Sequence, residues 1–403
     1  MIETYTVDGQ NFFKHILRRS GNVTTSFIPA CGNIIATPEN YDKVWLGTAQ
    51  KPICNTEKKL SLVDLFCGTG PMTLGVVEAG RCLGIEIEPK LAIDFNADAV
   101  LNYKLNFPTA NVIEGDITEY INGTFGDVLT LEEKNLLDGV GKVDCLIAGP
   151  PCQGHSDLNN HTRRDDPRNQ LILSAIRFAE ITNPEYVIIE NVQGIRHDKR
   201  NILDVAKEQL KSLGYSLYEN LLLASKFGVA QKRRRFILVA SKSEIDFNVE
   251  QYQRENTTSV LWATQDLGSK YNSKDIFNSS ARHSQTNQER IDYLFANDLY
   301  ELPNELRPKC QQKVNNSYTS VYGRMYPDNP APTITSGFGS IGQGRFAHPL
   351  FPRSLTPHEA SRVQFIPDYF KYDKSLSRVA LQKMIGNAVP PKLTYILTLE
   401  LLR

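Results

Sequence analysis

Short apolar runs alternate with helical patterns between residues 62 and 240 of this 403-residue chain. Parallel strands need a long crossover connection, usually a helix, so the alternation predicts an α/β fold with a parallel sheet and helices on both faces. Open sheets of this kind bind ligands at the carboxyl ends of their strands. The expected strands are residues 62–66, 91–95, 111–113, 143–148, 186–189 and 236–240, and the helices between them include residues 72–78, 170–181 and 202–213.

The alternation stops near Ala240, and a second domain is expected to begin there. Residues 241–375 are irregular, polar and rich in Asn, Ser, Gly and Pro, which predicts a smaller domain with little regular structure. A terminal apolar helix then returns the chain to the first domain. That domain is expected to comprise residues 61–240 and 376–403.

Residues 1–60 form an N-terminal extension without a strong pattern. Residues 12–17 predict the beginning of a helix, and residues 33–36 predict a short strand. The first ten residues mix charge and polarity and lack the apolar centre of a signal peptide. No function is assigned to this extension.

Charge and cysteine content limit the classes of function. Lys plus Arg and Asp plus Glu each number 45, so any contact with DNA must come from a local basic surface. The densest basic runs are residues 232–235 and the pair Arg163 and Arg164. The seven cysteines include no CxxC pair, so neither a zinc site nor a disulfide framework is expected, and a reducing, cytoplasmic compartment fits best. No apolar run approaches the length of a membrane span.

A cysteine follows one of the expected strands in the segment Gly-Pro-Pro-Cys-Gln-Gly-His-Ser, residues 149–156. Pro150 and Pro151 fix two φ angles and lack a backbone N–H, so they stiffen the turn that presents Cys152. A thiol held in this way at the carboxyl end of a strand suits a nucleophile. The alternative is a buried, inert cysteine, which is what most free cysteines are.

A glycine-rich turn, Asp-Leu-Phe-Cys-Gly-Thr-Gly, follows the first expected strand at residues 64–70. Glycines such as Gly68 and Gly70 let the backbone approach a ligand closely at the edge of a sheet. No GKS or GKT follows, so the turn is not a phosphate-binding Walker A loop. An NAD or other nucleotide site is the alternative that this turn alone leaves open.

An acidic residue at the end of the next strand is expected to bind a ribose. Asp94 is preferred because residues 91–95 form the cleaner strand, and Glu86 is the alternative. Asp116, after the third strand, could reach an adenine. Each of these acids could instead be a helix cap or a solvated turn residue.

Two later segments place charged side chains beside expected strands. Glu190 follows the run of residues 186–189, where a carboxylate could carry a proton during a reaction. Gln231, Arg233 and Arg235 alternate along a segment that leads into a strand, so they are expected to share one face. The alternatives are a solvated strand-end glutamate and a solvated basic edge.

The order and the amino-acid sequences of these segments resemble those of the DNA (cytosine-5) methyltransferases of the prokaryotic or phage modification type. The Pro-Pro-Cys-Gln, Glu-Asn-Val and Gln-x-Arg-x-Arg motifs carry the resemblance most specifically. It implies a Rossmann-like methyltransferase sheet that uses S-adenosylmethionine, and a smaller domain that reads DNA. The matching blocks are residues 64–70, 94–106, 149–156, 190–192, 231–235, 353–367 and 386–391.

The resemblance implies methyl transfer to carbon 5 of a cytosine flipped out of a specific duplex DNA site. Cys152 would add to carbon 6 of the ring, and Glu190 would hold or protonate ring N3. Arg235 would pair with Glu190 or the ring carbonyl, and Arg233 with the base or a phosphate. The other implied residues are Phe66, Gly68, Gly70, Asp94 or Glu86, Asp116, Pro150 and Asn387 for the cofactor, and Ser156, Arg163, Arg164, Gln231 and Thr333 for DNA.

The expected partner is double-stranded DNA, with no metal and no membrane, and the enzyme is expected to act as a monomer. Two rival readings are a tRNA cytosine-5 methyltransferase with the same motifs and a catalytically dead DNA-binding paralogue. The presence of both Cys152 and Glu190 disfavours the second rival. One departure from the family pattern is Pro71, which stands where a third glycine is usual, so the first turn is expected to be altered.

Overall fold

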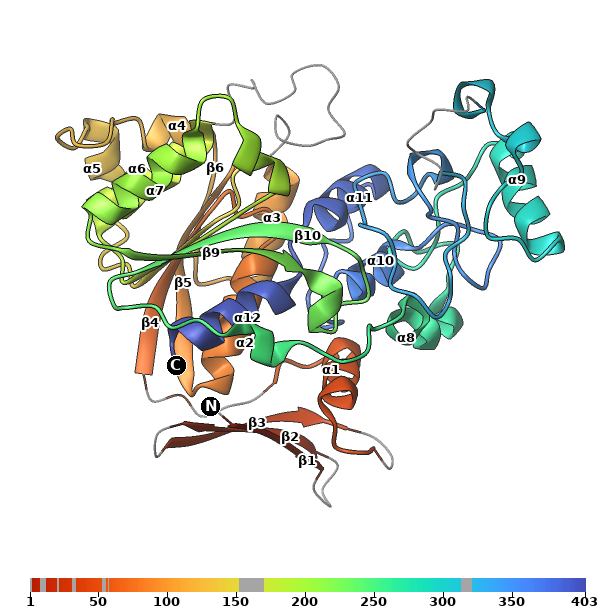
Figure 1. Cartoon of the computed structure of the whole chain (residues 1–403), viewed down its shortest axis with the longest axis horizontal. Helices are drawn as coiled ribbons and strands as arrows, with labels where there is room; N and C mark the ends of the chain where they lie inside the picture. Colours follow the sequence, from red (N-terminus) through yellow and green to blue (C-terminus); the bar gives the residue numbers. More distant parts are fainter. Residues whose placement is uncertain are drawn as a thin grey trace.

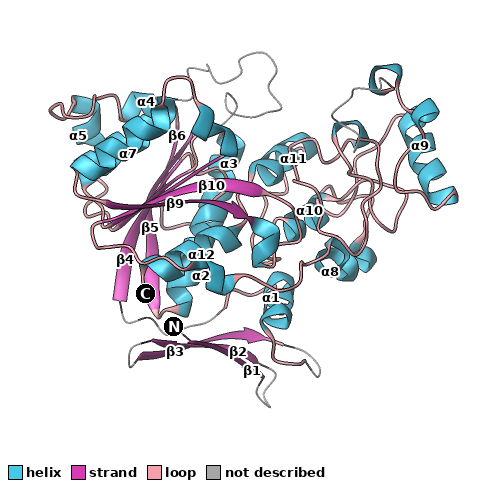
Figure 2. Ribbon diagram, viewed as in Figure 1, coloured by secondary structure: helices cyan, strands magenta, loops and turns pink. Residues whose placement is uncertain are grey.

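The computed structural model describes residues 2–7, 12–19, 22–30, 34–52, 56, 58–151, 170–312 and 321–403. In these parts a seven-stranded sheet carries helices on both faces; in the view of Figures 1 and 2 a three-stranded N-terminal sheet lies below it and a less regular domain lies to its right. The α/β class expected from the alternation is confirmed. None of the described helices is long and apolar enough to cross a lipid bilayer.

The strands are β1 (Ile2–Val7), β2 (Phe12–Arg19), β3 (Asn22–Pro29), β4 (Lys58–Leu65), β5 (Ile85–Asp94), β6 (Asn111–Glu114), β7 (Cys145–Ala148), β8 (Tyr186–Asn191), β9 (Ser216–Leu223) and β10 (Arg234–Ser241). The helices of the first domain are α1 (Pro38–Gly47), α2 (Pro71–Cys82), α3 (Ala97–Asn106), α4 (Ile117–Tyr120), α5 (Leu131–Leu137), α6 (Leu171–Thr182), α7 (Ile202–Ser212) and α12 (Pro391–Leu401). Those packed in or beside the second domain are α8 (Val260–Thr264), α9 (Gln285–Ala296), α10 (Pro357–Val363) and α11 (Arg378–Asn387).

The central sheet has the strand order β6-β5-β4-β7-β8-β10-β9. Strands β4 to β8 pair in parallel, whereas β10 runs antiparallel to both β8 and β9. The order reverses between β4 and β7, because the chain first builds outward to β6 and then returns to the other side of β4. Ligands of open α/β sheets bind beyond the carboxyl ends of the strands at such a reversal.

Two apolar cores cover the two faces of this sheet. One contains buried side chains of α2, α3 and α12, together with α1 and the inner face of the N-terminal sheet. The other contains buried side chains of α4, α5, α6 and α7. Alternate residues of the strands divide between the two: Leu62 and Ile237 lie in the first core, Val63 and Leu238 in the second. The parallel strands are therefore buried on both faces, as their continuous apolar runs require.

The N-terminal extension differs from the prediction. Residues 12–17 lie in β2 of an antiparallel sheet, so the helix predicted there is wrong. Phe13, His15 and Leu17 are buried and the residues between them are less so, which is the two-residue period of a strand. The buried polar His15 concealed that period in the sequence. Residues 34–36 have no regular structure, so the predicted strand at 33–36 is also wrong over its described part.

Two strands of the central sheet were placed incompletely. β9 was missed, because it lies at the edge of the sheet and most of its residues are half-buried, which leaves no clear apolar run. β5 begins at Ile85, six residues before its predicted start, and its pairing with β4 shifts register at Lys90. The shift lets one extra residue interrupt the pattern, as β-bulges do.

The second domain has its own apolar core, built from α8, α10, α11 and irregular segments. Its helix α10 begins at the Thr356–Glu359 capping box. Buried residues of α11, including Leu381 and Ile385, also belong to this core. Buried residues of α12 pack in the first core of the central sheet, whereas those of α11 pack in the core of the second domain. The domain boundary predicted at residue 376 remains a prediction.

Candidate active site

The loops after β4 and β7 leave the sheet side by side at the reversal. The N–H of Gly149 donates to the carbonyl oxygen of Leu65 over 3.2 Å, and the N–H of Cys67 donates to that of Ile93 over 3.1 Å. The ends of β4, β5 and β7 are thus joined by main-chain hydrogen bonds. Side chains and N–H groups of these three loops meet at one edge.

The turn after β4 has a backbone that few residues other than glycine adopt. Phe66, Gly68 and Gly70 have φ angles of 60°, 53° and 92°. A Cβ atom on Gly70 would lie 2.6 Å from the ring of Phe107, so that glycine is also required by space. Around Gly68 no described atom lies within 4 Å of the corresponding position, and backbone there can approach a ligand.

Pro71 does not disturb this turn. It is the first residue of α2, where a proline's fixed φ suits the helix and its missing N–H is not needed. The structure therefore explains how α2 can begin without a third glycine.

Asp94 is held beside the glycine turn. Its carboxylate accepts hydrogen bonds from the N–H of Gly68 at 2.8 Å and the N–H of Asn96 at 2.9 Å. Burial raises the pKa of Asp94, while the two N–H groups act in the opposite direction. Each carboxylate oxygen retains a second lone pair that a ligand hydroxyl could use.

Glu86, the alternative to Asp94, lies at the other end of β5. It pairs with Lys59 at 2.9 Å and its side chain is 45% exposed. Eight residues of strand separate Glu86 from Asp94, which is about 26 Å. This placement removes Glu86 from the edge where the loops meet.

Asp64 is a buried acid that the sequence reading did not select. It accepts a hydrogen bond from the Thr73 hydroxyl at 2.6 Å, and the Tyr103 hydroxyl lies 2.8 Å from the same Thr73 oxygen. Burial raises the pKa of Asp64 to about 8, although the bond from Thr73 lowers it. Its hydrogen bond with Thr73 joins the end of β4 to the first turn of α2, and so stabilises the glycine turn that lies between them. Its position directly before the turn was the available signal.

The three other expected cofactor residues, Pro150, Asp116 and Asn387, differ in their exposure and contacts. Pro150 is buried, directly after Gly149. Asp116 is exposed and caps α4, accepting from the N–H of Thr118 at 2.9 Å. Asn387 is exposed at the end of α11, and its carbonyl oxygen accepts a hydrogen bond from Arg233 at 3.4 Å.

Glu190 and Arg235 form an ion pair at the end of β8. Arg235 Nε lies 2.5 Å from Glu190 Oε1, and the two side chains are 13% and 9% exposed. The antiparallel pairing of β10 with β8 sets Ile237 opposite Glu190, which brings Arg235 within reach. The pairing expected between these two residues is present.

Gly149 connects this ion pair to the glycine turn. A Cβ atom on Gly149 would lie 3.8 Å from Glu190 Oε2 and 3.9 Å from the carbonyl oxygen of Phe66. The ends of β4, β7 and β8 therefore converge on one small region. Cys152, Ser156, Arg163 and Arg164 follow Gly149 in the chain, and these four expected site residues lie outside the described residues.

Gln231 and Arg233 are both buried, and both contact protein. Gln231 is fully buried; its amide binds the Gln364 side chain at 2.5 Å and accepts the N–H of Ile334 at 3.0 Å. The expected contact of Gln231 with DNA is therefore corrected, because no part of its side chain is exposed.

Arg233 needs the same correction. It is 2% exposed, and its guanidinium donates to the carbonyl oxygens of Ile334 at 2.8 Å and Gly386 at 3.1 Å. A contact with a base or a phosphate would require the guanidinium to leave these carbonyls. Arg233 thus joins the end of the sheet to the second domain.

Thr333 lies beside this junction. It is half-buried, and its hydroxyl donates to the carbonyl oxygen of Lys232 at 2.9 Å. The segment around it bridges to Gln231 through Ala331. Across the ranges that the structure describes, no three His, Cys, Asp or Glu side chains are grouped as metal ligands would be.

Comparison with known proteins identifies the family. The sequence model described as C-5 cytosine-specific DNA methylase matches residues 60–403. The chain belongs to this family. It is a DNA (cytosine-5) methyltransferase of the modification type, which confirms the resemblance seen in the motifs.

Two curated relatives and two solved structures illustrate the similarity. The chain is 46% identical to type II methyltransferase M1.BsuMI of Bacillus subtilis, over 100% of this chain and 95% of the relative. It is 30% identical to type II methyltransferase M1.HphI of Haemophilus parahaemolyticus, over 83% and 84%. The fold resembles S. pombe Dnmt2 methyltransferase (TM-score 0.57, 19% identity, 85% and 98% covered) and Entamoeba histolytica methyltransferase EhMeth (0.58, 16%, 86% and 98%).

Proposed function

We propose that this enzyme uses S-adenosylmethionine and methylates carbon 5 of an extruded cytosine through a temporary bond from Cys152 to carbon 6. The supporting observation is the convergence of the glycine turn, Gly149 and the Glu190–Arg235 pair on one edge of the sheet. Cys152 lies three residues after Gly149 in the sequence. Three residues span at most about 10 Å, which supports the choice of Cys152 as the nucleophile of this proposal.

The residues at the end of β4 fit the proposed cofactor. The open space at Gly68 admits a ligand against the backbone, and the Asp94 carboxylate would accept hydrogen bonds from ribose hydroxyls. Phe66 is half-buried and would provide an apolar contact. When bound, the cofactor supplies an electrophilic methyl group on a sulfonium.

The chain's own residues would prepare the base for this electrophile. Carbon 5 of cytosine is a weak nucleophile, and addition of the Cys152 thiolate to carbon 6 makes it an enamine carbon. Negative charge then develops toward N3, where Glu190 would hold or donate a proton. Arg235, fixed to Glu190 at 2.5 Å, would keep that carboxyl oriented toward the ring. Loss of the carbon 5 proton and expulsion of the thiolate would restore both base and enzyme.

The remaining details of the proposal concern DNA and assembly. The substrate is a cytosine in a specific duplex site, read by the second domain, and extrusion costs a few kcal/mol that pocket and phosphate contacts offset. Gln231, Arg233 and Thr333 would support the junction that holds the reading domain to the sheet. The enzyme is proposed to act as a monomer.

The test compares Cys152→Ala with Cys310→Ala, which changes an exposed cysteine of the second domain. Tritiated methyl transfer to duplex DNA and to tRNA would be measured for each. Cys152→Ala is expected to abolish transfer while S-adenosylmethionine binding persists, and Cys310→Ala to retain both. Duplex DNA carrying 5-fluorocytosine should form a covalent complex with the wild-type enzyme and with Cys310→Ala, but not with Cys152→Ala. Turnover by Cys152→Ala would rule out the covalent mechanism.

A further inference from the structure

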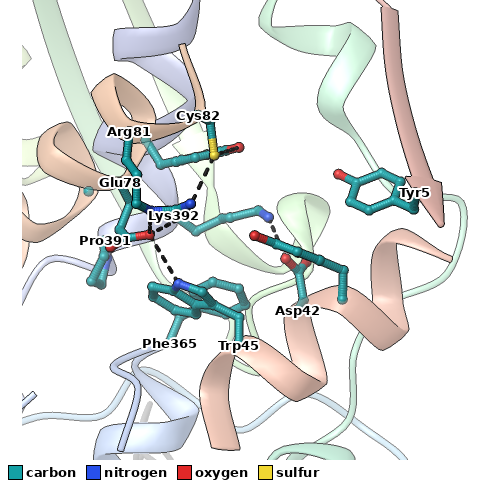
Figure 3. A pocket seen from close by; sticks show the side chains of 12 residues that line it. Tyr5, Asp42, Trp45, Glu78, Arg81, Cys82, Phe365, Pro391 and Lys392 are labelled. Atoms are coloured by element: carbon teal, nitrogen blue, oxygen red, sulfur yellow. Dashed lines mark hydrogen bonds and ion pairs between the residues drawn. The ribbon is translucent and has the colours of Figure 1, made fainter. Parts of the chain in front are cut away.

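A small pocket lies at the opposite end of α2 from the glycine turn (Figure 3). Its walls come from β1, α1, the end of α2, Phe365 and α12. Cys82 is the last residue of the 12-residue helix α2, so about 17 Å of helix separates it from Gly70. Residues before 60 lie outside the family match, so Tyr5 and the α1 side chains of this pocket are additions to the family's usual chain.

The sulfur of Cys82 is surrounded by polar groups from four elements. His15 Nδ1 of β2 lies 3.5 Å from Cys82 Sγ, and Arg81 Nη2 lies 3.6 Å away. The hydroxyls of Tyr395 on α12 and Ser26 on β3 lie at 3.6 Å and 3.8 Å. By contrast, Cys145 is buried in the sheet, and burial raises its pKa to about 12.

The carboxylate of Glu3 lies beside His15, within ion-pair distance but beyond hydrogen-bond distance. His15 Nε2 lies 3.7 Å from Glu3 Oε1, and the ring of Tyr5 stacks on the imidazole at 4.7 Å. The Tyr5 hydroxyl donates to Glu3 at 2.9 Å and fixes that carboxylate. Cys82, His15 and Glu3 therefore stand in the order nucleophile, base and acid that activated cysteines use.

The surrounding charges favour the ionised forms of this pair. Burial alone would raise the pKa of Cys82, but the positive charges of Arg81 and His15 outweigh it and lower that pKa. Burial would also lower the pKa of His15, whereas Cys82 and Glu3 raise it. Both shifts favour a thiolate beside an imidazolium. Glu78 is a further negative charge near Arg81.

One N–H donor of Arg81, Nη1, makes no hydrogen bond to the described residues. Arg81 Nε and Nη2 bind Glu78 at 2.9 Å and 2.5 Å, and Glu78 also accepts from Trp45 at 3.2 Å and Tyr369 at 2.8 Å. The guanidinium is thus fixed in place. Its Nη1 is buried and has no hydrogen-bond partner within the described ranges. A buried N–H without a partner is costly, so an oxygen-bearing ligand is the chemistry that would satisfy it.

We propose that Cys82 is a modification site at which a small peroxide oxidises the thiolate to a sulfenic acid. The sulfur is only 3% exposed, so the reagent must be small enough to enter the pocket. The thiolate attacks one peroxide oxygen, an S–O bond forms, and the O–O bond breaks. Sulfur loses two electrons, which reduce the peroxide. The hydroxide that leaves takes the proton of His15 and departs as water, assisted by the Arg81 Nη1 donor.

The experiment treats the full-length protein with hydrogen peroxide for a set time and then unfolds it in the presence of a cyclic 1,3-diketone, so that this trap for sulfenic acids also reaches buried cysteines. Peptide mass mapping then reports each cysteine separately. Cys82 is expected to be labelled about tenfold faster than the exposed Cys310, because a larger fraction is thiolate at neutral pH. Cys67 and Cys145 should remain unlabelled, because burial raises the pKa of both thiols.

Two variants keep the proposal falsifiable. His15→Gln should reduce Cys82 labelling to the rate of Cys310 or below, because the imidazolium is removed. Glu3→Gln leaves the buried His15 in place and should give an intermediate rate, and thermal unfolding would show that each variant is folded. Cys82→Ser should lose only the label at that position and retain methyl transfer. An unlabelled Cys82 beside a labelled Cys310, or folded His15 and Glu3 variants that label like wild type, would overturn the proposal.

Discussion

The edge of the central sheet and the second domain both bury polar groups, but they hold them differently. At the sheet edge, Asp94 accepts hydrogen bonds from two main-chain N–H groups. One belongs to Gly68 in the neighbouring loop, and the other to Asn96, two residues further along the chain. In the second domain, the buried Arg362 binds Asp266, which is 96 residues away in the chain, as well as Asp368. The first arrangement follows from where strands end, and the second from how distant loops meet.

This difference separates function from stability. A side chain held by main-chain N–H groups can be exchanged with little effect on the fold, since the strand that carries it remains. A buried ion is held by its partner's charge, and removal of one partner leaves the other uncompensated. Changes at the sheet edge should therefore reduce activity, and changes in the charged interior of the second domain should reduce stability.

The largest expected effect is that of Glu190→Gln. The amide keeps the size of the side chain but cannot supply a proton to the base, so kcat should fall by about 10²- to 10⁴-fold. Single-turnover methylation of duplex DNA would measure the change.

Arg235→Lys provides the matched comparison for that experiment. Lysine keeps the charge but not the Nε geometry of the 2.5 Å contact with Glu190, so an intermediate loss of kcat is expected. If Glu190→Gln methylated DNA at the wild-type rate, the proposed role of Glu190 in proton transfer to the base would be wrong.

Arg362→Met tests the opposite half of the comparison. The guanidinium is fully buried and contacts Asp368 at 2.5 Å and 2.9 Å, so its loss should lower the free energy of unfolding by about 3–5 kcal/mol. Lys270→Met is the control, because Lys270 contacts the same Asp368 at 3.0 Å but is 47% exposed. Its effect should stay below about 1 kcal/mol. Equal effects of the two variants on urea unfolding would contradict the distinction.

The same difference explains what the sequence could predict. The positions of Asp94, Glu190 and Arg235 followed from apolar runs and the residues that end or begin them, which are local features. The burial of Gln231 and Arg233 could not be predicted, because their partners Ile334, Gln364 and Gly386 lie more than 100 residues later. Alternation showed that the two side chains share a face, but not which part of the chain covers it.

The prediction for residues 12–17, which lie in strand β2, was wrong for a related reason. His15 is a polar residue within this segment, and the structure buries it against Cys82, 67 residues away. A polar residue whose partner is distant misleads any reading that equates polar with exposed. The 3.6-residue and two-residue periods cannot then be distinguished over so short a run.

Acid should weaken the second domain through Glu359. Burial alone would raise the pKa of Glu359, but hydrogen bonds from Arg353 and His348 lower it to about 2. A folded-state pKa below the unfolded value of 4.5 gives stability that is present above about pH 5 and lost as pH falls toward 2. The contribution is about 3 kcal/mol at most. Chemical unfolding of wild type and Glu359→Gln from pH 7 to pH 3 should converge as pH falls, and parallel curves would contradict the assignment.

The smallest expected effect separates the two acids of β5. Asp94→Asn keeps the shape of the side chain but weakens its hydrogen bonds to Gly68 and to a ribose, so the KM for S-adenosylmethionine should rise about tenfold, or about 1.4 kcal/mol. Glu86→Gln removes an acid about 26 Å along the same strand, paired only with an exposed lysine at 2.9 Å among the contacts described, and should leave that KM unchanged. Because both variants lose one carboxylate from one strand, overall charge cannot explain a difference between them. Equal KM values would show that closeness to the strand's carboxyl end does not decide which acid serves the cofactor.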